Sequence, residues 1–299
     1  MKKYFICLNL IIYHLVFVKI AQSQNENQEL SSSQDIKRVE IRNSEMWNLT
    51  SAFNGQTYEI DVFLPRGYNP KTSRLPVIYV LDAEYNFGCV AYITSRLIKN
   101  GDIPPVIVVG IAYNTGYDEY YALRERDCTP PSKINGLHSG GVEKFVKFLS
   151  EELFPFIDKK YKTLPGNRTI VGHSIGGFFC TYSLFEHPEL FSKYIIVSPS
   201  YWFSGDVIFS YEQTYASNHK ELNAAVYLST GKKESDRMIR TTQQMISVLN
   251  KRNYMGLIFK SFLPEDEHHR SIFPLAYTHG LQWLFGKENI GMMKNLNEE

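Results

Sequence analysis

Short, almost continuous apolar runs recur along the chain, and segments with apolar residues at helical spacing lie between them. Such runs are typical of strands that are buried on both faces of a parallel sheet. The runs predict strands at 76–81, 105–112, 169–171, 193–197, 224–229 and 257–262. The helical spacing predicts helices at 88–99, 141–158, 178–187, 236–251 and 271–285. This alternation indicates an α/β fold with a doubly wound, mostly parallel sheet.

The first part of the chain has a different pattern. Polar and apolar residues alternate at 39–41 and more clearly at 56–64, and Asn54-Gly55 is a turn signal between them. The sheet is therefore expected to begin antiparallel. No internal repeat or second domain boundary is visible, so a single domain is expected over 35–287. Within it, a polar and aromatic insertion at 113–140 is the candidate wall of a substrate pocket.

The N-terminus has the pattern of a secretory signal peptide. Lys2 and Lys3 precede an apolar run over 4–18, and small residues follow at Ala21 and Ser23. The run is about 15 residues long, which is short for a membrane-spanning helix. We expect cleavage near Ser23 and export to the periplasm or the medium, with an uncleaved anchor as the alternative. Two polar segments, 24–34 and 288–299, are expected to be a flexible lead-in and a C-terminal tail.

Composition narrows the possible partners. The chain has 299 residues and a formal net charge of +1, which gives no indication of nucleic-acid binding or of an anionic membrane surface. Its 19 Phe and 20 Tyr favour an aromatic-lined cleft. No spacing resembles a metal site. Cys180 is expected to be a buried free thiol, and Cys89 with Cys128 is a possible disulfide pair.

The strongest chemical signal is the segment Gly172-His173-Ser174-Ile175-Gly176, which fits the G-x-S-x-G pattern. In α/β-hydrolases this pattern forms a sharp turn between a strand and a helix, and the turn exposes a nucleophilic serine. A structural glycine-rich turn is the alternative. The helix that follows begins beside Ser174, so the N–H of Ile175 is a candidate donor to an oxyanion. The second donor is expected just after the strand at 76–81, at Ala83 or a neighbour.

A serine nucleophile needs a base, and the base needs an acid to orient it. In this fold they follow the serine in the order acid, then histidine, on loops after later strands. His268 and His269 are the candidate bases after the strand at 257–262. Glu234 and Asp236 are the candidate acids after 224–229, and Asp236 would also suit a helix N-terminus.

Other residues are candidates for binding rather than catalysis. Tyr85, Arg126 and Trp202 are the candidate substrate contacts. For the arginines, an ion-pair cluster of Arg124, Arg126 and Asp127 that would hold the insertion near the cleft is the preferred interpretation, and substrate binding is the alternative. His173 and His279 are expected to be structural, with His173 pointing away from the cleft.

Several stretches together resemble the putative esterase family of α/β-hydrolases, which includes enterochelin (siderophore) esterases, feruloyl and acetylxylan esterases and relatives of formylglutathione hydrolase. The resemblance covers about residues 55 to 286, through the stretches 77–82, 126–130, 140–145, 152–155, 168–177, 185–191 and 198–202. Glu267-His-His269-Arg-Ser271 is similar to the family's E-x-H-x-S pattern, and Gly231-Lys-Lys-Glu234 to its G-x-x-E loop. The resemblance therefore favours His269 and Glu234.

One departure from the family concerns the oxyanion site. The family often has Asp-Gly after the first central strand, whereas this chain has Asp82-Ala83. If the donor there needed a positive φ, alanine would be strained.

The sequence thus predicts an exported serine carboxylic-ester hydrolase that forms an acyl-enzyme through Ser174, His269 and Glu234, without metal or organic cofactor. The expected substrate is a small-molecule or oligosaccharide ester, with carbohydrate-linked acetyl or feruloyl esters preferred. A siderophore ester is the alternative substrate, and a non-catalytic binding module is the alternative from another class.

Overall fold

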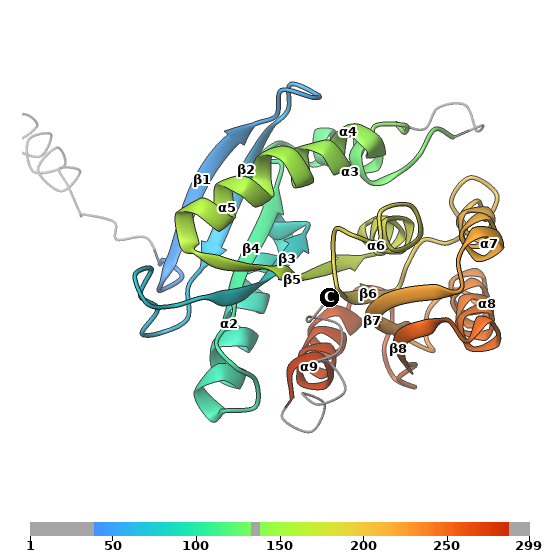
Figure 1. The fold of residues 1–299 in the computed structure, drawn as a ribbon. Coiled ribbons are helices and arrows are strands. Elements are labelled where there is room, and N and C mark those ends of the chain that lie inside the picture. Colours follow the sequence, from blue (N-terminus) through green and yellow to red (C-terminus); the bar gives the residue numbers. More distant parts are fainter. Residues whose placement is uncertain (1–38, 133–137, 287–299) are drawn as a thin grey trace, which may run out of the picture. The chain divides into compact units, whose positions relative to one another are not determined.

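The fold is built on one eight-stranded sheet in the order β1-β2-β4-β3-β5-β6-β7-β8 (Figure 1). The computed structural model describes residues 39–132 and 138–286, and those from Arg42 onward belong to a single compact unit. β2 pairs antiparallel with β1 and β4, and all other neighbours are parallel. The predicted α/β-hydrolase architecture, with its antiparallel start, is confirmed.

The strands and helices follow one another as the apolar runs predict. The strands are β1 (Ser44–Thr50), β2 (Thr57–Phe63), β3 (Leu75–Leu81), β4 (Ile107–Ala112), β5 (Thr163–His173), β6 (Lys193–Val197), β7 (Glu221–Ser229) and β8 (Met255–Phe262). The helices are α2 (Ala83–Asn100), α3 (Tyr117–Cys128), α4 (Val142–Lys147), the π-helical turn η1 (Phe148–Leu153), α5 (Phe154–Tyr161), α6 (Ile175–Glu186), α7 (Ile208–Asn218), α8 (Asp236–Arg252) and α9 (Ile272–Phe285). None of these helices is long and apolar enough to cross a membrane.

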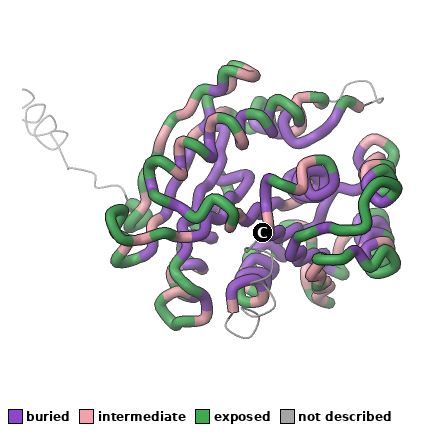
Figure 2. The backbone as a smooth tube through the Cα atoms, in the orientation of Figure 1, coloured by how far each residue is buried: buried purple, intermediate pink, exposed green. Residues whose placement is uncertain are grey.

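Helices cover both faces of the sheet, and the central strands between them are buried (Figure 2). Each face has its own apolar core. α2 and α9 pack on one face, where the hydroxyls of Thr94 and Tyr277 lie 2.7 Å apart. Residues of α3 to α8 pack on the other face. Neighbouring residues of β3 alternate between the two cores: Ile78 faces the α2/α9 side and Tyr79 the opposite side. Burial on both faces explains why the central strands read as unbroken apolar runs.

The largest differences from the predicted elements lie in the first half of the chain. No strand forms at 39–41; the first strand is β1, and its mostly exposed edge position leaves a weak sequence pattern. α2 begins at Ala83 rather than near 88, immediately after Asp82. The insertion at 113–140 contains a helix, α3, which the sequence pattern did not indicate.

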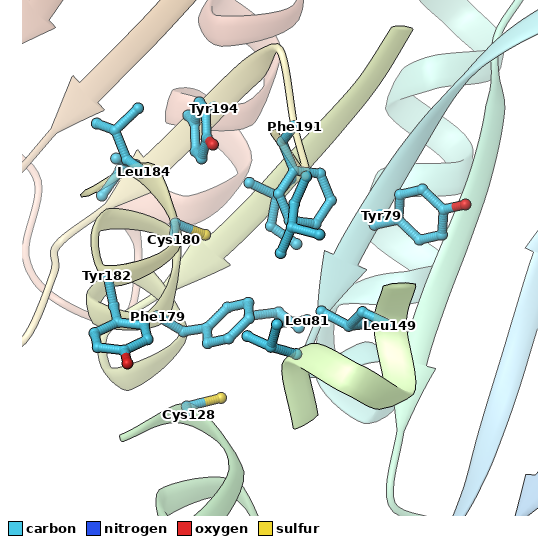
Figure 3. Close-up of a cluster of buried hydrophobic side chains, with 14 of the residues drawn as sticks. Tyr79, Leu81, Cys128, Leu149, Phe179, Cys180, Tyr182, Leu184, Phe191 and Tyr194 are labelled. Atoms are coloured by element: carbon cyan, nitrogen blue, oxygen red, sulfur yellow. The ribbon is translucent and has the colours of Figure 1, made fainter. Parts of the chain in front are cut away.

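The cysteines are all unpaired among the described residues. The suggested Cys89–Cys128 disulfide is therefore wrong. Cys180 is a buried free thiol, as expected, and it lies on α6 within the larger core, close to Phe179 and Leu184 (Figure 3).

Candidate active site

The turn between β5 and α6 holds Ser174 in a strained conformation. Its φ of 60° and ψ of −116° lie outside the regions that non-glycine residues favour. A Cβ added at Gly172 would lie 2.3 Å from the carbonyl oxygen of Gly176, so this close approach of strand and helix requires glycine. The turn thus has the form of a nucleophile elbow, at the carboxyl end of a central strand.

Glu234 and His269 are brought together from two different loops. Nδ1 of His269 lies 2.8 Å from Oε2 of Glu234, whose side chain is only 1% exposed. The other oxygen of Glu234 accepts hydrogen bonds from the Ser198 hydroxyl at 2.5 Å and from the Gly231 N–H at 2.9 Å. Burial acts to raise the pKa of Glu234, but these three donors outweigh it and lower the pKa below 4.5. The carboxylate is therefore ionised at neutral pH and orients the imidazole.

The competing candidates lie elsewhere. His268 is exposed, and its Nδ1 accepts a hydrogen bond from the N–H of Arg270. Asp236 is exposed in the first turn of α8, where the capping residue is Ser235. Neither is placed to form the contact that His269 makes with Glu234.

Ser174 and His269 line the same cavity, which has a volume of about 550 Å³. The hydroxyl of Ser174 lies 3.1 Å from that of Ser200. Among the described residues, no hydrogen bond joins Ser174 to His269, so a direct proton transfer between them requires the two side chains to come closer. The Nδ1–Glu234 contact leaves Nε2 of His269 as the nitrogen that can accept this proton.

Comparison with known proteins identifies the family of the chain. The sequence profile of the family described as "Putative esterase" matches residues 51–273. The chain belongs to this esterase family. It is 28% identical over 261 residues to the ferri-bacillibactin esterase BesA of Bacillus subtilis. The aligned residues make up 81% of this chain and 90% of that protein. It is also 28% identical over 188 residues to the siderophore triacetylfusarinine C esterase of Aspergillus fumigatus, covering 61% and 64% of the two chains.

Solved structures of similar proteins have the same fold. The esterase superposes on the BES protein of Bacillus cereus with a TM-score of 0.76 and 28% identity, over 84% of this chain and 98% of that one. An IroE-like serine hydrolase from Shewanella oneidensis matches with a TM-score of 0.73 and 27% identity, over 81% and 80%. The protein is therefore a carboxylic ester hydrolase with the α/β-hydrolase fold.

Tyrosines form one wall of the esterase's cavity. Tyr85, Tyr117 and Tyr121 are 58%, 64% and 46% exposed, and Tyr120 packs edge-on against Tyr85 and Tyr121 with ring centroids 5.1 Å apart in both pairs. Tyr85 is thus placed where the sequence analysis expected a substrate contact. The three tyrosines of α3 were missed individually, although the aromatic insertion that carries them was identified as a pocket wall.

The other two candidate substrate contacts do not line this cavity. Arg126 donates to both carboxylate oxygens of its neighbour Asp127, at 2.7 and 3.0 Å. Trp202 is 39% exposed and packs against Arg237, whose guanidinium carbon lies 5.6 Å from the ring centroid. In this structure both side chains instead have partners outside the cavity: Arg126 pairs with its sequence neighbour, and Trp202 packs against a residue of α8.

The ion-pair cluster of the insertion is divided into two separate pairs. Arg124 does not join Arg126 and Asp127 but binds Asp82, at 2.6 Å. Asp82 is buried and lines the cavity, a role the sequence analysis did not assign. Asp82 also has the positive φ, 60°, so the strain expected at Ala83 is at its neighbour.

The two backbone groups that the sequence analysis expected to be oxyanion donors each lie at the start of a helix. Ile175 is the first residue of α6, and Ala83 is the first residue of α2. The first N–H groups of a helix have no partner within it and carry its positive dipole end. Both N–H groups therefore remain candidate donors.

His173 does not point away from the cavity as predicted. It lines the cavity, and its ring centroid lies 4.4 Å from that of His269. Its Nε2 is fully buried and has no hydrogen-bond partner among the described residues. Burial, followed by repulsion from His269 and Arg124, lowers the pKa of His173 from 6.5 to about 4, against weaker attraction from Asp82 and Glu234.

This shift predicts a pH dependence of stability. Because the folded state holds His173 neutral, the unfolded chain binds its proton more readily, and stability should fall as the pH drops from 6.5 towards 4. The substitution His173→Gln should reduce this loss of the free energy of unfolding by at most about 3 kcal/mol. Urea unfolding at pH 7 and pH 4.5 measures it, with His279→Gln, an exposed site, as the control. Parallel pH curves for His173→Gln and the wild type would contradict the assignment.

Proposed function

We propose that this esterase cleaves its substrate through an acyl-enzyme on Ser174. Nε2 of His269 accepts the hydroxyl proton while Oγ of Ser174 attacks the ester carbonyl. The oxyanion that forms accepts hydrogen bonds from the N–H groups of Ile175 and Ala83. His269 then gives the proton to the leaving alcohol, and water attacks the acyl group in a second round of the same steps.

The observation that carries this proposal is the contact between His269 and Glu234 beside the elbow. An imidazole fixed through Nδ1 by a buried carboxylate has the tautomer that a general base needs. Glu234, unlike Asp236, also has its second oxygen fully engaged by Ser198 and Gly231, so its orientation is set. A non-catalytic binding module would have no use for this arrangement.

For the substrate we favour a catechol-bearing siderophore ester. Siderophore esterases are prominent among the relatives, and the exposed rings of Tyr85, Tyr117 and Tyr121 offer stacking surfaces for aromatic groups. Arg270 also lines the cavity and would attract an anionic substrate. The sequence alone favoured carbohydrate-linked esters. They remain the second candidate, because a xylanase/feruloyl esterase of Xylanibacter ruminicola is 29% identical over 177 residues, covering 55% of this chain and 22% of that protein.

A substrate panel tests the proposal. The kcat/KM values for a ferric tri-catechol siderophore ester, methyl ferulate and acetylated xylan are compared under the same conditions. We expect the siderophore ester to be preferred by at least about 10-fold, roughly 1.4 kcal/mol of transition-state binding. Preference for xylan or ferulate would move the assignment to carbohydrate-linked esters. Binding of a ligand without turnover of any ester would favour the binding module.

We also propose that the protein is exported and that its signal peptide is cleaved. The predicted signal peptide, 1–23, lies outside the described residues, as do the lead-in 24–34 and the tail 288–299. The mass of the protein isolated from the periplasm or the medium tests the prediction. A mature chain that begins near Gln24 is expected, and a chain that keeps Met1 would contradict cleavage.

A further inference from the structure

The insertion helix α3 holds the turn that follows β3. Asp82 has a left-handed conformation there, with φ 60° and ψ 45°. Nε and Nη2 of Arg124 donate to its two carboxylate oxygens at 2.6 and 2.7 Å, and the Tyr120 hydroxyl donates to one of them at 2.8 Å. Left-handed geometry at a non-glycine residue costs on the order of 1 kcal/mol and persists where the surroundings impose it. These three hydrogen bonds impose it here.

The same guanidinium reaches the nucleophile elbow. Nη2 of Arg124 also donates to the carbonyl oxygen of His173, the residue before Ser174, at 2.7 Å. The turn after β3 and the start of α6 are in contact as well: a Cβ at Gly176 would lie 3.4 Å from Oδ2 of Asp82. Arg124 therefore bonds to both turns at the point where they meet.

These two turns carry the two candidate oxyanion donors. The N–H of Ala83 belongs to the peptide that follows Asp82, and the N–H of Ile175 lies two residues after His173. Donors stabilise a developing oxyanion well only when they are fixed before the charge appears. A side chain that hydrogen-bonds to both turns fixes the distance between the two N–H donors.

We propose that Arg124 is a positioning residue that fixes the two halves of the oxyanion hole relative to each other. The inference rests on the proposed function and extends it, because it makes α3 part of the machinery that stabilises the transition state. Arg124 is buried, and its charge is matched by Asp82. Burial disfavours the charged guanidinium, but attraction from Asp82 outweighs this and raises the pKa of Arg124. A lysine keeps the charge but cannot form the planar fork that reaches all three oxygens.

The test is Arg124→Lys, assayed with p-nitrophenyl acetate and with an alkylboronic acid, which forms a tetrahedral adduct resembling the transition state. We expect kcat to fall by about 10- to 100-fold while KM stays within about 3-fold. The affinity for the boronic acid should fall by the same factor as kcat/KM. Tyr120→Phe removes one donor from Asp82 and should show the same pattern at about 3- to 10-fold; it decides the question if Arg124→Lys does not fold.

The matched control is Arg168→Lys. Arg168, in the middle of β5, forms a partly buried pair with Asp158 of α5 at 2.6 Å, outside the cavity. We expect it to lower the melting temperature without lowering kcat. If Arg124→Lys, or Tyr120→Phe in its place, loses stability but keeps the wild-type kcat and boronic acid affinity, the positioning role is overturned while the proposed function stands. A Ser174→Ala enzyme that turns over esters normally would overturn both.

Discussion

Ser174→Ala is expected to lower kcat for p-nitrophenyl acetate by about 10⁴- to 10⁶-fold. Removing the hydroxyl takes away the atom that forms the acyl bond in the proposed mechanism, and the oxyanion donors alone retain little catalysis. The fold should be preserved, because within the part of the chain that the structure describes the substitution removes a single side-chain hydrogen bond, the one to Ser200. The rate is measured at saturating ester, beside a thermal melt.

Ser183→Ala is the matched control for this substitution. Ser183 lies on the same helix, α6, and its hydroxyl donates to the Cys180 carbonyl at 3.0 Å within the core, away from the cavity. The same atom is removed, so any general effect on folding appears there too, and kcat should stay unchanged. Equal rates in wild type and Ser174→Ala would remove Ser174 from the mechanism.

Glu234→Gln is expected to lower kcat by about 10³- to 10⁴-fold with little change in KM. The amide oxygen should stay with the donors Ser198 and Gly231, so the amide NH₂ would face Nδ1 of His269. A donor at that position stabilises the tautomer that carries its proton on Nε2. Nε2 could then not accept the proton of Ser174, although the shape of the site would be retained.

Asp236→Asn makes the same chemical change two residues away. Asp236 is exposed and was the alternative acid in the sequence, so this variant should keep the wild-type kcat. The opposite result, with a large loss at Asp236→Asn and less than about 10-fold at Glu234→Gln, would contradict the assigned pairing.

The elements that the sequence predicts best are those whose pattern is set by local burial. β6 occupies the predicted range 193–197 because it is buried throughout. The exposed edge strand β1 has no such signal. α3 was missed because its tyrosines face the cavity and Arg124 binds Asp82, so no apolar stripe runs along it.

The features of the site also differ in whether they depend on neighbouring residues or on distant ones. The elbow at Ser174 is encoded within a few neighbouring residues, since its strained turn and its glycines are local requirements. The partners of Arg124 are not local: which carboxylate it meets depends on where α3 packs, and 42 positions separate it from Asp82. The sequence could therefore name the charged residues of the insertion but could not assign them to Asp82 and Asp127.

Trapping the acyl-enzyme tests the central claim most directly. The protein is mixed with p-nitrophenyl acetate, quenched in acid within milliseconds, digested with trypsin and analysed by tandem mass spectrometry. The peptide 169–193 should carry one acetyl group on Ser174, and the adduct should be absent from Ser174→Ala. An enzyme that turns over the ester while its acetyl group is found on another residue would contradict the account.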